Sequence, residues 1–486
     1  MSAPPEFPEK ADVQRLVAYG YDFERSRHFI LEVKTPQKAR AFLAGLVELG
    51  LITDASADNE DVIARKNRGC CPTHIGFTFR GLQELRLSPA LLLAFREKAQ
   101  AYTEGAALRA ARRLADSGAS AAPWWDASFQ HGRAHLLLSF YADTENELDR
   151  FAEVLRQIPG ADDLDGWDAA LDGCHLSPDK AQRRVHFGFR DGISNPRIAG
   201  FHSPEAVPES KAPGLHAPGE FLLGYENDEG FNPWLLLNPE PRPNPWLLPT
   251  AHFDPGFFRN GSFAAFRKIE QHEAEFNAFV SAHATQLGVS EAYVRAKLAG
   301  RWDDGSVVRP DEESAPLPAP ANDGDPPPEA PLNDFDFSDD AKGRGCPFGA
   351  HIRRMNPRGD LIVPFRRRPL IRRGMPYGRR YQDAPADKRG LLGLFFCASL
   401  EDQFEHLLAQ WGYANPMGPD NWGDAKDPLI GNHQDARAVF DIPVAGEQTR
   451  QIDGFKPFVT TRGTLYAFYP GLSALRDIAR MDALRR

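Results

Sequence analysis

Residues 342–378 read KGRGCPFGAHIRRMNPRGDLIVPFRRRPLIRRGMPYG, and they carry the most distinctive pattern in the chain. A tight Cys-Pro-Phe-Gly-Ala turn leads to one histidine, His351. The protein as a whole is acidic, with a formal net charge of −10, so a basic segment here reverses the local sign of charge. Ten arginines follow the histidine, at positions 353, 354, 358, 366, 367, 368, 372, 373, 379 and 380.

A histidine followed by arginines suits a site for an anionic group that carries a metal. Imidazole is a common metal ligand, and guanidinium groups bind carboxylates in bidentate geometry. A metallated, carboxylate-bearing cofactor such as haem would use both. The residues alone leave blander interpretations open, because His351 is one of 14 histidines and can be an ordinary hydrogen-bonded residue. The arginines can likewise form a solvated surface or a nucleic-acid patch.

Length and composition indicate a globular protein with a large core. The 486 residues are 42% hydrophobic and 26% charged, which is ordinary for such proteins, and the length suggests about two to three domains. No apolar run is long enough to span a membrane. The acidic total and the lack of interleaved aromatic residues weigh against nucleic-acid binding. We therefore expect neither nucleic acid nor a membrane as a partner.

The cysteines and the N-terminal residues bear on the cellular compartment. The sequence MSAPPEFPEKADVQ has neither the basic start and apolar run of a secretory signal nor a twin-arginine motif. We therefore expect a cytoplasmic protein with reduced thiols. A Cys346 thiolate is a further alternative as a metal ligand. The five cysteines, at positions 70, 71, 174, 346 and 397, follow no spacing for a zinc ribbon or for covalent haem attachment.

A short apolar strand followed by an amphipathic helix recurs four times along the chain. Strands are predicted from short bounded apolar runs, and helices from apolar residues at i, i+3 and i+4. Four such units predict an α+β fold of two similar halves, each a doubled, ferredoxin-like motif, with any other α/β fold as the alternative. The pairs are 27–34 with 36–49, 135–141 with 144–158, 262–269 with 270–282, and 391–398 with 400–411.

Two further segments complete the pattern. Residues 183–197 read RRVHFGFRDGISNPR, where we predict a strand over 185–189 that runs into an Asp-Gly turn. The turn by itself explains Asp191. Residues 311–331, DEESAPLPAPANDGDPPPEAP, are rich in proline and acid and have too little apolar content to pack, which predicts a solvated loop.

Together these segments resemble the dye-decolourising peroxidase family, long-chain branch. CPFGAHIRRMNPR and LIRRGMPYG are similar to the haem-binding segment of that family, and FGFRDG is similar to its G-x-x-D-G signature. Other stretches agree from about residue 70 to residue 480, among them HIGFTFRGL (74–82), FLLGYENDEG (221–230) and DPLIG (427–431). Long loops such as 311–331 fit the larger members of the family.

The resemblance implies duplicated ferredoxin-like domains that form a dimeric α+β barrel-type fold. Residues 1–210 would form the N-terminal ferredoxin-like domain, which ends in the G-x-x-D-G segment. Residues 211–486 would form the C-terminal haem-binding domain, which includes the acidic loop 311–331. The resemblance also leaves room for a homodimer.

The resemblance further assigns roles in a peroxidase site. It implies that His351 is the proximal ligand of heme b (iron protoporphyrin IX), that Asp191 is the distal acid–base residue, and that Arg372 is the distal arginine. The second nitrogen of His351 should donate to an acid, for which the sequence leaves several candidates open: Glu401, Asp402, Asp334 and Asp336.

Four more residues are expected at the cofactor. Gly188 and Gly192 occupy the glycine positions of the G-x-x-D-G motif. Arg353 and Arg354 are expected to pair with the haem propionates. If His351 is not the metal ligand, the next candidates are His175, His186 and His406.

The implied activity is a haem-dependent peroxidase that uses hydrogen peroxide to oxidise dyes and phenolic or other aromatic donors by one-electron steps via a ferryl intermediate. Asp191 would move the peroxide proton, and Arg372 would stabilise the charge that develops as the O–O bond breaks. An unperturbed aspartate has a pKa of ~4 and an unperturbed histidine one of ~6.5, so a carboxylate base predicts activity at acidic pH. The alternative is a haem carrier or iron-releasing protein on the same fold, which needs only the proximal side.

Overall fold

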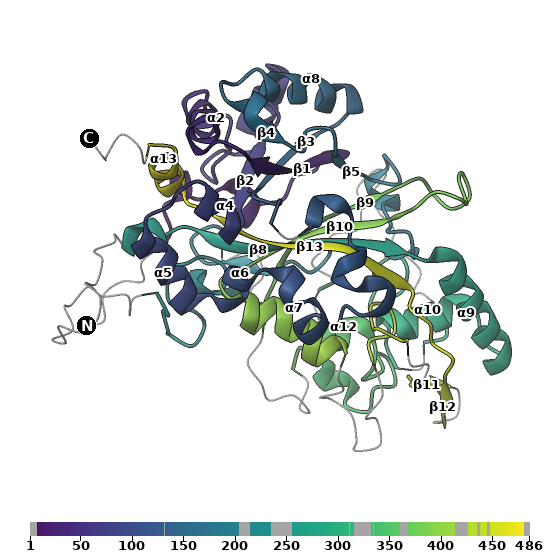
Figure 1. The fold of residues 1–486 in the computed structure, drawn as a ribbon. Helices are drawn as coiled ribbons and strands as arrows, with labels where there is room; N and C mark the ends of the chain where they lie inside the picture. Colours follow the sequence, from purple (N-terminus) through teal and green to yellow (C-terminus); the bar gives the residue numbers. More distant parts are fainter. Residues whose placement is uncertain are drawn as a thin grey trace.

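The four apolar runs that the sequence pairs with helices enter one nine-stranded sheet (Figure 1). The structure, a computed structural model, describes residues 7–130, 132–203, 214–234, 255–310, 312–314, 332–333, 335–359, 368–413, 426–434, 438–444 and 448–480. Most of the acidic loop 311–331 lies outside these residues, as do Arg366, Arg367 and Asp334.

The N-terminal half of the sheet has the order β4-β1-β3-β2. These strands are β1 (Arg25–Val33), β2 (Thr73–Phe77), β3 (Leu136–Ala142) and β4 (Leu164–Asp165), and β5 (Leu171–Cys174) also pairs with β1. Helices α2 (Pro36–Glu48) and α8 (Glu145–Arg156) lie over the same side of these strands (Figure 1). Strands one to four of this half therefore lie in the order fourth, first, third, second.

The C-terminal half repeats this order as β13-β8-β10-β9. Its strands are β8 (Ser262–Gln271), β9 (Ile371–Tyr377), β10 (Gly390–Cys397) and β13 (Val459–Tyr469). Each half again reads fourth, first, third, second, which confirms the prediction of duplicated ferredoxin-like motifs. The halves join where Phe77 of β2 pairs with Phe468 of β13. The predicted domain boundary at residue 210 lies outside the described residues and stays a prediction.

Local sequence explains why the predicted helices form where they do. Thr144 and Glu147 make a capping box at the start of α8, where the threonine hydroxyl accepts from the Glu147 N–H and the glutamate accepts from the Thr144 N–H. The apolar face of α8 is buried through Leu148, Phe151 and Leu155. Helix α9 (Glu273–Leu287) follows β8, as predicted, and ends at Gly288 in the left-handed conformation.

Two local predictions are wrong. Residues 400–411 do not form an α-helix but two π-helical segments, η11 (Leu400–Glu405) and η12 (Leu407–Gly412). Residues 185–189 do not form a strand, because the chain turns back at Gly188, where the Gly188 N–H donates to the Val185 carbonyl and the Val185 N–H to the Phe189 carbonyl. Gly188 has φ +86, which glycine adopts without strain.

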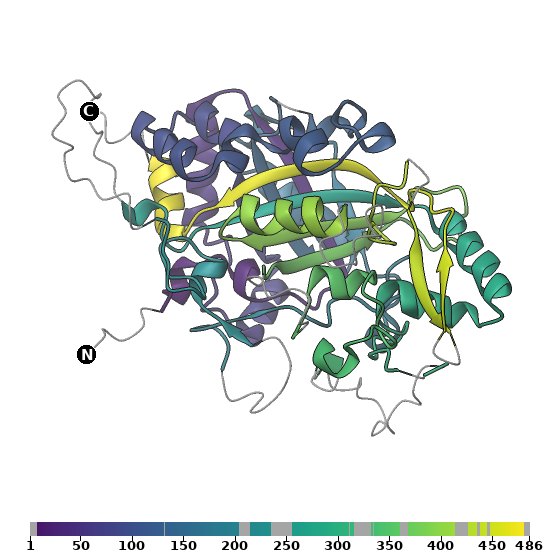
Figure 2. The same cartoon turned by 90° about the horizontal axis from the view of Figure 1, so that it is seen from below.

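The π-helical pair, light green in Figure 2, lies across the face of the C-terminal half-sheet. Helices α9 and α10 (Glu291–Ala299) extend beyond the end of the sheet, beside the hairpin of β11 (Phe440–Val444) and β12 (Gln448–Ile452) (Figure 1). No described helix is long and apolar enough to cross a membrane. The remaining elements are α1 (Arg15–Ala18), α3 (Asn59–Asn67), α4 (Phe79–Glu84), α5 (Pro89–Lys98), α6 (Gln100–Glu104), α7 (Ala106–Arg113), α12 (His351–Met355), α13 (Leu472–Arg480), β6 (Arg197–Ile198) and β7 (Leu215–His216).

Candidate active site

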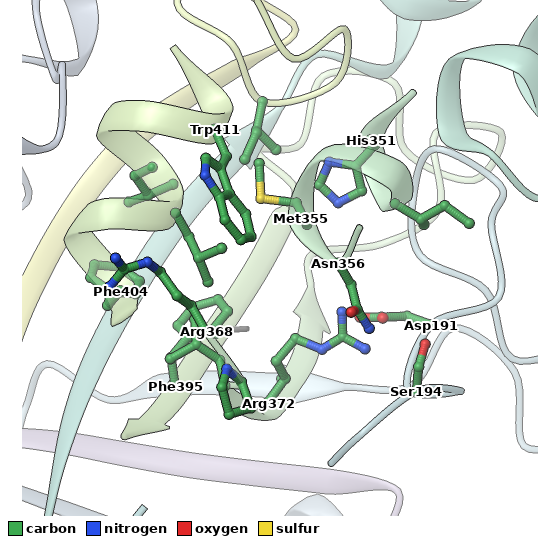
Figure 3. Close-up of a pocket in the computed structure, with 18 of the residues that line it drawn as sticks. Asp191, Ser194, His351, Met355, Asn356, Arg368, Arg372, Phe395, Phe404 and Trp411 are labelled. Carbon is green, nitrogen blue, oxygen red and sulfur yellow. The ribbon is translucent and has the colours of Figure 1, made fainter. Parts of the chain in front are cut away.

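A cavity of about 300 Å³ lies against the C-terminal half-sheet, at the lower end of the range of cofactor sites. Strands β8, β9 and β10 form one wall, η11 and η12 a second, and α12 a third, while the loop that carries Asp191 closes the remaining side. The wall contributed by the π-helices is apolar and includes Phe404, Leu407 and Trp411 (Figure 3). Residues from both halves of the chain therefore meet at one cavity.

His351 begins α12 and turns its ring into this cavity (Figure 3). Its Nδ1 lies 2.8 Å from Oδ2 of the buried Asp427. The other oxygen of Asp427 accepts the backbone N–H groups of Leu429 and Ile430, at 2.9 and 3.0 Å. Because a carboxylate only accepts, Nδ1 carries the proton and Nε2 is left with its lone pair, which is the form that binds a metal.

The pair is also matched electrostatically. Burial would lower the pKa of His351, but the charge of Asp427 and its hydrogen bond raise the pKa overall. Burial would raise the pKa of Asp427, yet the charge and hydrogen bond of His351 lower it overall. Asp427 is therefore held as a carboxylate behind the imidazole.

The acid partner of His351 is thus a correction to the sequence analysis. Of the four acids proposed there, Glu401 accepts from the Ala101 N–H at the start of α6, Asp402 bonds Ser399, Asp336 bonds Ser338, and Asp334 is outside the described residues. The signal that could have found Asp427 was the DPLIG stretch at 427–431. Asp427 opens a turn there, in which its side chain accepts the backbone N–H groups of Leu429 and Ile430.

Asp191 and Arg372 meet on another side of the cavity, although 180 residues separate them in the sequence. Figure 3 shows the guanidinium of Arg372, on β9, pointing toward Asp191, with His351 apart from both. Asp191 is exposed, and one of its oxygens accepts the Gly192 N–H at 2.7 Å. The structure therefore brings together the three residues that sequence reasoning placed at the centre of the site.

Two side-chain amides fix the loop that carries Asp191. Oδ1 of Asn195 accepts the backbone N–H of Arg372 at 2.9 Å. Nδ2 of Asn333 donates to the Ile193 carbonyl, while its Oδ1 accepts from Arg301 and Arg358 at 3.3 and 3.2 Å. Neither amide lines the cavity, so both position the residues that do.

Arg353 and Arg354 do not line the cavity, which corrects the prediction that they pair with propionates. On a helix that starts at His351, the next two to three positions turn about 200° and 300° away. Arg353 donates to the Asp340 and Cys346 carbonyls and stacks on Phe337 and Phe348. Arg354 donates to the Gly349 and Trp411 carbonyls. Both guanidiniums hold the backbone around α12.

Other arginines line the cavity instead. Arg301 donates to the Gly305 and Leu332 carbonyls, and burial, with a smaller contribution from the nearby Arg372, lowers its pKa to about 10. Arg358 donates to the Asn333 carbonyl. Arg267 is neutralised by a bidentate pair with Asp116. Cationic side chains thus face the cavity and favour an anionic group there. The cavity-lining arginines are Arg267, Arg301, Arg358, Arg368, Arg372 and Arg373.

Gly188 and Gly192 have a conformational role. Their φ angles are +86 and +81, and a Cβ added at either would meet nothing within 4 Å. They do not line the cavity, so the prediction that they contact the cofactor is not supported by their position. They let the loop turn so that Asp191 projects from it.

The alternative metal ligands lie elsewhere. His175, His186 and His406 do not line the cavity. Cys346 does not line it either, and burial raises the pKa of its thiol to about 12, which disfavours a thiolate ligand. One histidine that sequence reasoning missed does line the cavity: His216 on β7, whose Nδ1 is bonded to Asp228.

Fold and site together define a peroxidase with two similar ferredoxin-like halves, a histidine on one side of a cofactor cavity and an Asp–Arg pair on another. The particular family follows from the curated relatives, although no protein-family model matches the chain. The dye-decolorizing peroxidase msp1 of Mycetinis scorodonius is 29% identical over 96% of this chain and 87% of its own length. The multifunctional dye peroxidase DyP2 of an Amycolatopsis species is 29% identical over 91% and 89%.

Solved structures agree with this comparison. A dye-decolorizing peroxidase in complex with 2,6-dimethoxyphenol superposes with a TM-score of 0.76 at 25% identity, and covers 97% of this chain and 99% of its own. The chain is therefore similar to dye-decolourising peroxidases over most of its length, in sequence and in fold. The resemblance to dye-decolourising peroxidases that the sequence indicated is confirmed, and the relatives named here are peroxidases.

Proposed function

We propose that this protein is a heme b peroxidase that uses hydrogen peroxide to oxidise phenolic and other aromatic donors, dyes among them. The observation that carries the proposal is the arrangement in one cavity of a His351–Asp427 pair and an Asp191–Arg372 pair. Carriage of haem would need only the first pair. The presence of the second favours peroxidase chemistry over a carrier.

The residues present fit a haem. Nε2 of His351 faces the cavity with its lone pair, because Nδ1 donates to Asp427. The apolar wall of Phe404, Leu407 and Trp411 suits a porphyrin face, and Arg301 and Arg358 are placed to bind carboxylates. When bound, haem supplies the iron that accepts peroxide and the electron-transfer chemistry.

The remaining work falls to the side chains of this chain. Asp191 is placed to take a proton from one oxygen of hydrogen peroxide and to deliver it to the other, which leaves as water. The guanidinium of Arg372 points toward Asp191 and would stabilise the charge that develops on the departing oxygen. Asp427 fixes the tautomer and orientation of His351 and makes the imidazole a stronger donor.

We further propose a cytoplasmic location. All five cysteines are thiols and none forms a disulfide, which suits a reducing compartment such as the cytoplasm. A homodimer, which the sequence leaves possible, stays a prediction.

The test is the absorption spectrum of protein produced with a haem precursor, recorded before and after one equivalent of hydrogen peroxide. A Soret band that shifts with peroxide and returns when 2,6-dimethoxyphenol is added supports the proposal. A Soret band that ignores peroxide would point to a carrier. Absence of any Soret band after reconstitution with hemin would refute a haem site at His351.

A further inference from the structure

His216 is a second histidine with a carboxylate behind it that lines the same cavity. Its Nδ1 lies 2.6 Å from Oδ2 of Asp228, and Oδ1 of Asp228 accepts the Ala217 N–H at 2.7 Å. Since the carboxylate only accepts, Nδ1 carries the proton and Nε2 carries the lone pair. The arrangement repeats that of His351 and Asp427 in a different segment of the chain.

The backbone places His216 next to the loop of Asp191. His216 lies on β7, which pairs in parallel with β6, and β6 starts six residues after Asp191. The Ala199 N–H donates to the His216 carbonyl at 2.9 Å. The ring packs edge-on against the buried Phe221, at 6.0 Å between centroids. The imidazole is therefore held on the Asp191 side of the cavity by both backbone and side-chain contacts.

The remaining nitrogen of His216 has no other task in the described residues. Its side-chain contacts there include a hydrogen bond with Asp228 through Nδ1 and the T-shaped ring contact with Phe221. His216 lines the cavity wall. Among the described residues, its Nε2 is not one of the fully buried polar atoms that lack a hydrogen-bond partner, so this nitrogen is accessible. A lone pair is thus presented to whatever enters the cavity beside the cofactor.

We infer that His216 is the base that accepts the proton of a phenolic donor, an inference that rests on the proposed peroxidase function. A phenol that loses one electron becomes strongly acidic, so a base at its oxygen eases the oxidation. In the step, the phenol O–H bond breaks and its proton forms an N–H bond at Nε2. The electron passes to the cofactor that peroxide has oxidised, and the product leaves as a phenoxyl radical. Asp228 stabilises the imidazolium, which afterwards returns its proton to water.

A pair of donors separates this role from a structural one. Oxidation of 2,6-dimethoxyphenol releases a proton, whereas oxidation of ferrocyanide releases none. We expect His216→Leu and Asp228→Asn to lower the ratio of the two kcat/KM values, phenol over ferrocyanide, by about 100-fold, as for loss of a general base. Asp228→Asn acts because its oxygen stays on the Ala217 N–H and its NH₂ group faces Nδ1, which moves the imidazole proton to Nε2.

Two further measurements on the same proteins test whether the cavity is intact and whether the proton acceptor has changed. Hemin titration by the Soret band is expected to give the same affinity in both variants as in the wild type, which shows an intact cavity. The solvent deuterium isotope effect on phenol oxidation is expected to change in the variants, because the proton acceptor has changed. Asn227→Asp is the matched control, since Asn227 precedes Asp228 in the sequence and its side-chain oxygen accepts the backbone N–H groups of Glu229 and Phe231, which an aspartate can also accept.

Four results would overturn the inference. Wild-type kcat/KM values for both donors would show that His216 takes no proton, and an equal loss with both donors would show a structural role. Loss of the Soret band would make His216 a cofactor ligand instead. A wild-type protein that binds haem but oxidises neither donor would refute the proposed function itself, and the inference with it, and this outcome is visible before any variant is compared.

Discussion

Replacement of Asp427 by asparagine is expected to weaken haem binding by reversing the tautomer of His351. In the native pair, Oδ2 of Asp427 accepts from Nδ1 at 2.8 Å, and Oδ1 accepts from two backbone N–H groups. Backbone N–H groups can only donate, so the single oxygen of an asparagine must remain with them. Its NH₂ group then faces Nδ1 and donates to it. A neutral imidazole that accepts at Nδ1 carries its proton on Nε2, the nitrogen that faces the cavity.

The size of the effect follows from the groups involved. Loss of a partner behind a metal-bound histidine costs about 10- to 100-fold in affinity or activity, or roughly 1.4 to 2.8 kcal/mol at about 1.4 kcal/mol per tenfold change. We expect the hemin affinity of Asp427→Asn to fall within this range. Restoration of the protonated Nδ1 needs an acceptor atom beside it, which the NH₂ group of asparagine does not provide.

The assay is a titration of the apoprotein with hemin, followed by the Soret band. Asp228→Asn is the matched control, because it makes the same change behind His216 and should leave hemin affinity unaltered. The reasoning would be refuted if Asp427→Asn bound hemin as tightly as the wild type, or if the two variants lost affinity equally.

The other predictions concern Asp191, Arg372, Asn195 and His28. Asp191→Asn and Arg372→Leu should keep haem but slow its reaction with peroxide by about 100-fold or more, and stopped-flow rates equal to the wild type would contradict the distal assignment. Asn195→Asp keeps the acceptor for the Arg372 N–H and should react with peroxide near the wild-type rate. Asn195→Ala should react about 10- to 100-fold more slowly at equal haem content. Equal rates for the two variants would count against this contact. Burial lowers the folded-state pKa of His28 to about 3, below the unfolded-state value of ~6.5. The neutral His28 therefore contributes its full share of the free energy of unfolding above pH ~6.5. That share is lost as the pH falls toward 3, and roughly 3 kcal/mol is lost by pH 4.5. Urea midpoints should therefore fall less on acidification in His28→Gln than in the wild type.

This acid sensitivity bears on how the enzyme would work. A carboxylate base predicts the best activity at acidic pH, where buried neutral histidines such as His28 destabilise the fold. Initial rates on a dye should thus rise as the pH falls, while the lifetime of the protein shortens. A neutral-to-alkaline optimum of the initial rate would contradict a carboxylate base.

Local physics allowed much of the fold to be predicted from the sequence. The strands and most helices follow from short-range apolar periodicity and caps, such as the Thr144–Glu147 capping box. The repeated strand–helix order indicated two similar halves, which the sheet order confirms. The prediction for residues 400–411 was wrong because apolar spacing cannot distinguish an α-helix from the π-helices that place Phe404 and Leu407 in the cavity wall.

The candidate site likewise contains residues that were predicted from the sequence and residues that only the structure places there. His351, Asp191 and Arg372 could be assigned because the short motifs that contain them resemble those of the dye-decolourising peroxidases, whereas local physics alone left an ordinary histidine and a turn aspartate as alternatives. Three other features required the packed molecule: Asp427 stands behind His351, the rotation of α12 turns Arg353 away from the cavity, and His216 faces into it. Contacts between distant segments depend on how the elements pack, and a hydrogen bond between residues 76 positions apart leaves no periodic trace in the sequence.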